Sequence, residues 1–230
     1  MNKKTQGRRS SEHCAAVATK MPWWRREARF LDRPLTPLSR FFLLLVAGLF
    51  VAIVFLPLWR ITLVAPQYEE GLRVSIYSYK LVGGNGGQDL DEINKLNHYI
   101  GMRALQQSDF VEMKWMPFAL GLFALIALRT AAHGRMSQVI DLFALFTYFG
   151  LFSMGLFYYR LFTYGHTLDP TAPMTIEPFT PMLVGKNQIA NFVQYSFPLV
   201  GGVLMVLIPV LLFGSFWFSR KPLMSQGLDS

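Results

Sequence analysis

Four long apolar segments divide the chain, and polar segments of very different lengths separate them. The first, 41–58, and the fourth, 197–218, contain no charged residue. The second, 115–132, carries Arg129 near one end, and the third, 139–162, carries a charged residue near each end. Each segment is close to the ~20 residues that a helix needs to cross the ~30 Å of hydrocarbon in a bilayer. The pattern predicts four transmembrane helices.

The polar segment 59–114 contains secondary-structure signals of its own. Apolar and polar residues alternate over 72–77, which predicts a strand and, with the residues before it, a small β-hairpin. Asp89, followed by an acidic residue three positions later, predicts the start of a helix that runs to about Gln106. The segment 163–196 shows no comparable pattern, and we predict a loop there.

Basic residues are distributed unevenly, and their positions predict the orientation. The first forty residues hold ten Lys and Arg against three acidic residues, whereas 59–114 holds six against seven. Cytoplasmic flanks of membrane proteins retain positive charge. We therefore predict a mainly α protein of the bacterial inner membrane, with both termini (the arm 1–40 and the tail 219–230) in the cytoplasm. The segments 59–114 and 163–196 are then periplasmic, the first as a small α+β insertion.

The composition agrees with a membrane protein and excludes several classes of site. Hydrophobic residues make up 52% of the chain and aromatic residues 15%, more than a soluble domain of this length normally carries. The net charge of +8 follows from the predicted topology, so it is no argument for nucleic acid binding. The one cysteine, Cys14, lies in the basic arm, so the periplasmic segments contain no disulfide or thiolate site. Since no nucleophile with a base and no phosphate loop is present, we expect no enzyme.

The basic arm contains one segment with a helical pattern, at about 22–33. Apolar residues recur there at helical spacing and arginines fall opposite them, which predicts an amphipathic helix lying on the inner leaflet in contact with lipid. A docking site for a partner subunit is the alternative. The predicted anchoring residues are Trp23, Trp24, Arg25, Arg26 and Leu31.

Two histidines and a methionine are the candidate chemistry on the periplasmic side. His98 and Met102 are four residues apart on the predicted helix and so share a face with Asn94. His166 follows the third apolar segment, with Asp169 shortly after it. Imidazole and thioether suit copper, especially Cu(I), so His98, Met102 and His166 are candidate ligands, supported by Asp169 and Asn94. Alternatively, His98 hydrogen-bonds a backbone carbonyl and Met102 fills an apolar gap.

Four runs of the sequence carry a family resemblance: LPLWRITLVAPQYEEGL, INKLNHYIGM, YGHTLDP and PFTPMLVGKNQIANFVQYSFPLVGG. Together they resemble a family of small four-helix bacterial membrane proteins often encoded beside the maturation genes of nitrous oxide reductase. The resemblance covers about 56–202 and not the basic arm. It departs at Glu69 and Glu70, where a proline-containing turn is expected. The matching positions are Pro66, Gln67, Tyr68, Gly71, Leu72, Asn97, His98, Tyr99, Gly101, Met102, Gly165, His166, Asp169 and Pro170.

The resemblance implies the context of a periplasmic copper enzyme and its assembly, without an established mechanism. The leading hypothesis is therefore a non-enzymatic inner-membrane accessory protein that holds or delivers copper at the periplasmic face for such an enzyme. The alternative is a structural subunit of a larger copper-enzyme or respiratory membrane complex, with no metal site of its own. A redox protein is the weakest hypothesis, because no pair of histidines lies within the apolar segments to bind haem.

Overall fold

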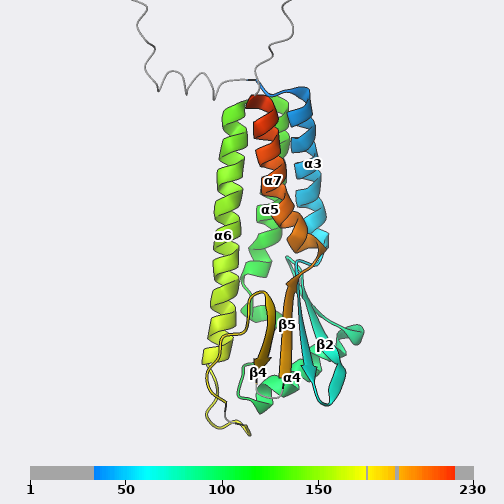
Figure 1. Ribbon diagram of the computed structural model, residues 1–230, viewed down its shortest axis with the longest axis vertical. Helices are drawn as coiled ribbons and strands as arrows, with labels where there is room; N and C mark the ends of the chain where they lie inside the picture. The colour runs from blue at the N-terminus through cyan, green and yellow to red at the C-terminus, as the bar shows by residue number, and fades with distance from the viewer. Residues whose placement is uncertain (1–33, 175, 190–191, 221–230) are drawn as a thin grey trace, which may run out of the picture.

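The computed structural model describes residues 34–174, 176–189 and 192–220, and this part of the chain contains four helices long and apolar enough to cross a membrane. The prediction of four such helices is confirmed, and in Figure 1 they lie side by side as a bundle. The helices are α3 (Pro37–Phe55), α5 (Glu112–His133), α6 (Met136–His166) and α7 (Val200–Arg220).

The ends of the first helix differ from the predicted 41–58 for local reasons. Thr36 caps α3, because its hydroxyl accepts the Ser39 N–H at 3.3 Å, and Pro37 occupies the first turn, where a missing N–H costs nothing. Leu56 is already extended, as a residue that precedes a proline prefers to be. The fourth helix begins at Val200 rather than at 197, because Phe197 belongs to a strand.

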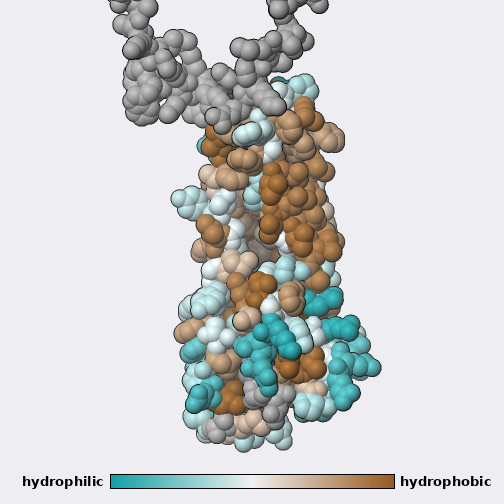
Figure 2. Space-filling model, viewed as in Figure 1, coloured by the Kyte–Doolittle hydropathy of each residue, from teal (hydrophilic) through white to brown (hydrophobic). Residues whose placement is uncertain are grey.

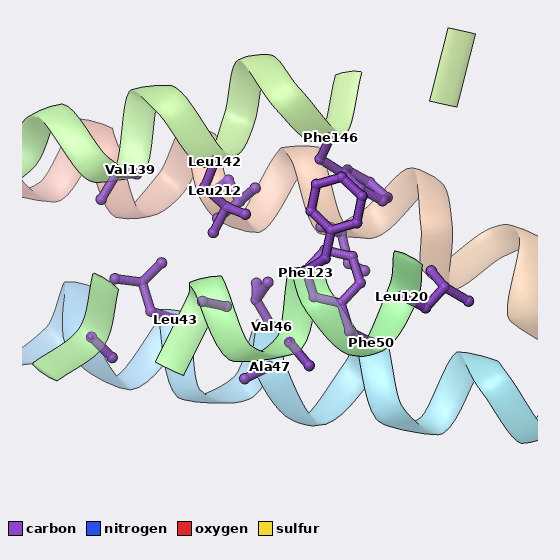
Figure 3. Packing of buried hydrophobic residues seen from close by; sticks show 14 of the residues in the cluster. Leu43, Val46, Ala47, Phe50, Leu120, Phe123, Val139, Leu142, Phe146 and Leu212 are labelled. Carbon is purple, nitrogen blue, oxygen red and sulfur yellow. The ribbon is translucent and has the colours of Figure 1, made fainter. Parts of the chain in front are cut away.

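Aromatic side chains fill the centre of the bundle. Phe50 of α3 is fully buried and stacks on Phe123 of α5, with ring centroids 5.5 Å apart. Phe146 of α6 meets Phe50 edge-on at 5.0 Å and Phe123 at 5.4 Å, and Figure 3 shows these rings gathered between the helices. Leu43 and Val46 continue the same buried face of α3 at helical spacing. Ile208 and Leu212 of α7 belong to the same buried cluster, so the four helices pack as one unit.

A five-stranded antiparallel sheet lies at one end of the bundle (Figure 1), and strands from both polar segments form it. The strand order is β3-β2-β1-β5-β4. Central strand β1 pairs with β2 on one side and with β5 on the other, where Trp59 faces Pro198 and Val64 faces Val193. The strands are β1 (Trp59–Ala65), β2 (Tyr68–Ile76), β3 (Leu81–Gly83), β4 (Gly185–Ile189) and β5 (Phe192–Pro198).

The sheet corrects two predictions. The hairpin predicted in 59–114 exists as β1 and β2, but it is only part of the sheet, and the predicted loop 163–196 contains β4 and most of β5. The two segments therefore form one unit, the sheet domain (59–109 and 167–198). The pairing of β1 with β5 joins residues about 130 positions apart, and such pairing leaves no local pattern in the sequence. In Figure 2 hydrophilic residues gather on this domain, while apolar residues cover the helices.

Helix α4 (Gln88–Tyr99) covers one face of the sheet, where Ile93 packs on Leu72 and Val74. The predicted capping by Asp89 is wrong: Gly87 is the N-cap, and the Asp89 carboxylate instead accepts the Arg73 N–H at 2.9 Å. Two short 3-10 turns lie on either side of α4 in the sequence: η1 (Asn85–Gly87) follows β3, and η2 (Gln107–Asp109) precedes α5.

The predicted end of this helix at Gln106 is also wrong. Helix α4 ends at Tyr99, because Gly101 takes the left-handed conformation (φ +77°) and the Met102 N–H turns back to the Asn97 carbonyl at 2.8 Å. These bonds are a glycine-terminated Schellman motif. Met102 thus lies beyond the helix, and its predicted helical alignment with His98 is absent.

Candidate functional site

The end of α4 and the segment after α6 are joined through their backbones. The Asp169 N–H donates to the Gly101 carbonyl at 2.8 Å, and the Met174 N–H donates to the Tyr99 carbonyl at 3.0 Å. Gly101 permits this approach, since a Cβ on it would lie 2.7 Å from the Asp169 carbonyl oxygen. Two sequence runs singled out above, around 97–102 and 165–170, are therefore in direct contact.

A groove lies at this junction, and it contains three of the five residues predicted to form or support a metal site: His98, Met102 and Asp169. His98 and Asp169 are exposed and Met102 is half-buried. The turn at Gly101, rather than helical spacing, brings Met102 to the same groove as His98. The remaining lining residues are Gly101, Arg103, Ala104, Thr167, Leu168, Thr171, Ala172 and Pro173.

Asp169 is oriented by its own loop. Its Oδ1 accepts both the Thr171 hydroxyl at 2.6 Å and the Thr171 N–H at 2.9 Å. These two bonds hold the pKa of the Asp169 carboxyl below its ordinary value, and the electrostatic interaction with His98 adds a smaller lowering. The carboxylate is therefore a fixed negative charge in the groove. Its hydrogen bonds within the described residues go to Thr171 and not to His166, the predicted partner.

His166 ends α6 and lies beside the groove without lining it. Its ring stacks on Phe162 with centroids 3.9 Å apart, and its Nδ1 is 3.0 Å from the Phe162 carbonyl oxygen. An Nδ1 that donates to this carbonyl leaves Nε2 as the nitrogen able to bind a metal. His166 is exposed, so this nitrogen is accessible to solvent or to another chain.

Asn94 has a structural role instead of the predicted place beside a metal. Its Oδ1 accepts the Leu105 N–H at 2.7 Å, and its Nδ2 donates to the Leu105 carbonyl at 3.4 Å. Both ends of the amide are thus used to hold the segment that follows α4. Asn94 fixes the position of Met102 indirectly, because Met102 lies within that segment.

Sequence reasoning missed a polar network that joins α6 to η2 and the start of α5. Arg160 of α6 binds both carboxylate oxygens of Glu112, at 2.9 and 3.1 Å, and the Tyr164 hydroxyl donates to Asp109 at 3.2 Å. Asp109 lies shortly before α5, and Glu112 is the first residue of that helix. Acidic residues at the start of an apolar helix were the sequence signal for this network. The network fixes the end of α6 against the start of α5 and so positions His166.

Within residues 34–174, 176–189 and 192–220, no group of three His, Cys, Asp or Glu side chains is arranged to hold a metal ion. Methionine sulfur is a further possible metal ligand, and Met102 lines the groove. The predicted membrane anchor, Trp23, Trp24, Arg25, Arg26 and Leu31, lies outside the described residues.

Comparisons with protein-family models, with curated proteins and with solved structures found no match to this chain. The family resemblance therefore stays a prediction.

Proposed function

We propose that the chain is a multi-pass membrane accessory protein that holds copper in the groove between α4 and the segment after α6, for the assembly of a copper enzyme on that side of the membrane. The supporting observation is that His98 and Met102, the imidazole and thioether donors, line one groove. Both donor types suit Cu(I), and a thioether binds it without losing a proton. Asp169 adds a negative charge that favours a cation there.

The proposed site is built from two donors of this chain and is completed by a third. One candidate for this third donor is His166, which lies three residues before Asp169. In this proposal its Nε2 binds the copper after a movement of the segment 167–174 or of the imidazole ring. A donor from the recipient enzyme is the other source. An incomplete, exposed site fits a protein that passes its metal on, because the recipient's ligands can replace solvent at an open position.

The test is Cu(I) loading of the detergent-purified protein under anaerobic conditions, with copper counted per chain after removal of excess metal. We expect about one copper in the wild type, and loss of most of it in His98→Ala and in Met102→Leu. His133→Ala is the matched control, since His133, like His98, is an exposed histidine in the last turn of a helix, but on α5. Equal copper retention in all four proteins would contradict the proposal.

A second candidate function is a structural subunit of a larger membrane complex, and Tyr148 favours it. Tyr148 is 75% exposed and lies near the middle of α6, the least buried of the four candidate spans. A phenol hydroxyl facing hydrocarbon lacks a hydrogen-bond partner, whereas a neighbouring helix can supply one. Co-purification of a partner that is lost in Tyr148→Phe but survives His98→Ala would favour this function over copper holding.

A further inference from the structure

A second cavity adjoins the proposed copper site, and Met102 lines both. It lies between one face of the sheet, α4 and the last turns of α6, and its volume is about 110 Å³. Its walls are almost entirely apolar: Leu63 and Val74 come from the sheet, Ile93 and Leu96 from α4, and Phe157 and Leu161 from α6. Well-packed interiors contain few voids larger than a water molecule.

One buried polar atom in this wall, the side-chain oxygen of Gln194, has no hydrogen-bond partner among the described residues. Gln194 of β5 is only 3% exposed, it lines the cavity, and its Oε1 accepts no hydrogen bond. Ser196, two residues later on the same face of the strand, is fully satisfied: its hydroxyl accepts the Trp59 indole N–H at 2.8 Å and donates to the Leu183 carbonyl at 2.8 Å. Leaving a buried amide oxygen without a hydrogen bond costs free energy, so Gln194 Oε1 is available to accept a hydrogen bond from a bound molecule.

The shape and chemistry of the cavity select the ligand. A trapped water needs two to four polar partners. The exposed wall is almost entirely apolar, and two of its other polar side chains, Arg160 and Tyr164, are already bonded to Glu112 and Asp109. A dry cavity of ~150 Å³ holds a benzene molecule, so this smaller and partly open cavity holds a short stretch of alkyl chain or the inner part of a small ring. We propose that the cavity binds a neutral, mainly apolar molecule with one hydroxyl group, which donates to Gln194 Oε1 while the walls enclose the apolar part.

This inference rests on Gln194 and the apolar walls and not on His98, although Met102 lines both the cavity and the groove. Two sources can deliver such a molecule: a hydroxyl-bearing lipid reaching the cavity past Phe157 and Leu161 of the candidate span α6, or a small alcohol or phenol from water. The cavity recognises the same chemistry in both cases, namely one donor at Gln194 and an apolar body.

The probe for the test is 4-fluorophenol, followed by ¹⁹F NMR in detergent and compared with 4-fluoroanisole, which has the same ring but no donor. We expect saturable binding beyond that of protein-free micelles, with about a tenfold preference for the phenol, the effect of one hydrogen bond. Gln194→Met is expected to remove the preference and keep the ring binding. Gln107→Met is the matched control, since the Gln107 amide is exposed and bonds the Tyr79 carbonyl at 3.1 Å.

Leu161→Phe, which fills the cavity from α6, is expected to reduce binding of both probes and gives a second route if Gln194→Met does not fold. Uptake no greater than that of empty micelles, or a phenol preference unchanged in Gln194→Met, would overturn the proposal. Solvent extraction of protein purified from membranes, followed by mass spectrometry, separates the sources: a hydroxylated lipid retained by the wild type and lost in Leu161→Phe assigns the membrane. Phenol binding without a retained lipid assigns the aqueous source.

Discussion

The Asp169 N–H donates to the carbonyl of Gly101 across 2.8 Å, and this bond joins the two segments that build the sheet domain. Gly101 makes the bond possible in two ways. Its left-handed backbone (φ +77°) ends α4, and its missing side chain lets the Asp169 backbone approach. The groove with His98 and Met102 exists only where these two segments meet.

Gly101→Ala is therefore expected to destabilise the protein strongly. The left-handed backbone costs an alanine about 1–2 kcal/mol, and displacing the Asp169 backbone adds about 1–3 kcal/mol of overpacking. The measurement is the free energy of unfolding in detergent, together with hydrogen exchange of the Asp169 amide. Gly86→Ala is the control, because Gly86 has a similar φ of +69° but open space around its Cα. Equal losses in the two variants would show that the close approach is unimportant.

The Trp59→Phe variant tests how much the hydrogen bond from Trp59 to Ser196 stabilises the pairing of β1 with β5. The substitution removes the indole N–H that donates to Ser196 at 2.8 Å but keeps a ring against Phe157. We expect a loss of about 0.5–1.5 kcal/mol in the free energy of unfolding, and faster amide exchange over 192–198. Trp115→Phe provides the comparison, since the contacts of Trp115 are with the rings of Phe149 and Phe152. Unchanged amide exchange in β5 would show that this hydrogen bond does not stabilise the strand pairing.

Glu112→Gln is expected to loosen the end of α6. The Arg160 guanidinium then loses a charged, bidentate partner at a position where both side chains are largely shielded from water. Removing one member of such a pair costs about 3–5 kcal/mol when it is fully buried, and we expect somewhat less here. Lys95→Met is the control, because the exposed Lys95–Glu92 pair contributes at most about 1 kcal/mol.

A charge exchange sharpens this test. In the double variant Glu112→Arg with Arg160→Glu, the pair is restored in reverse, and unfolding in detergent should return partly toward the wild type. A double variant no more stable than the worse single variant would indicate that the position of each charge, and not their pairing, matters.

The pH dependence of the groove follows from Asp169. Its pKa is lowered in the folded protein from an ordinary value of 3.8, so its charged form stabilises the fold above pH ~4 and that stability disappears as the pH falls through the lowered pKa. Thr171→Val removes the side-chain hydrogen bond, the largest cause of the shift, and should raise the pKa toward 3.8. Carboxyl ¹³C NMR between pH 5 and 2 measures both titrations. Identical curves would contradict the role of Thr171.

The sequence was sufficient for features that local patterns determine. Apolar length predicted the four long helices, and alternation predicted the strand over 72–77, because burial in lipid or against one face of a sheet selects residues position by position. The end of α4 was missed, although Gly101 was visible, because a helical pattern continues past it to Leu105. The left-handed backbone of Gly101 and the hydrogen bond from the Met102 N–H to the Asn97 carbonyl together set that boundary.

The candidate site was predicted in part, for a similar reason. His98 and Met102 do share a groove, but a turn and not a helical face brings them there. His166 was predicted beside them from its position after an apolar helix, whereas its Nδ1 is bonded to Phe162 within its own helix. The contact between the two segments depends on packing across long sequence separations, and no periodicity encodes it.

If α5 and α6 cross a bilayer, as their length and composition allow, the pairing of β1 with β5 depends on the insertion of both helices. Strand β1 precedes the helical pair α5 and α6, and β5 follows it, so one edge of β1 stays open until α6 has been synthesised and inserted. Residues 59–65 and 192–198 can meet only when an even number of helices between them crosses the bilayer. A chain in which either helix fails to insert leaves its two halves of the sheet on opposite sides, with exposed strand edges that mark it as misassembled.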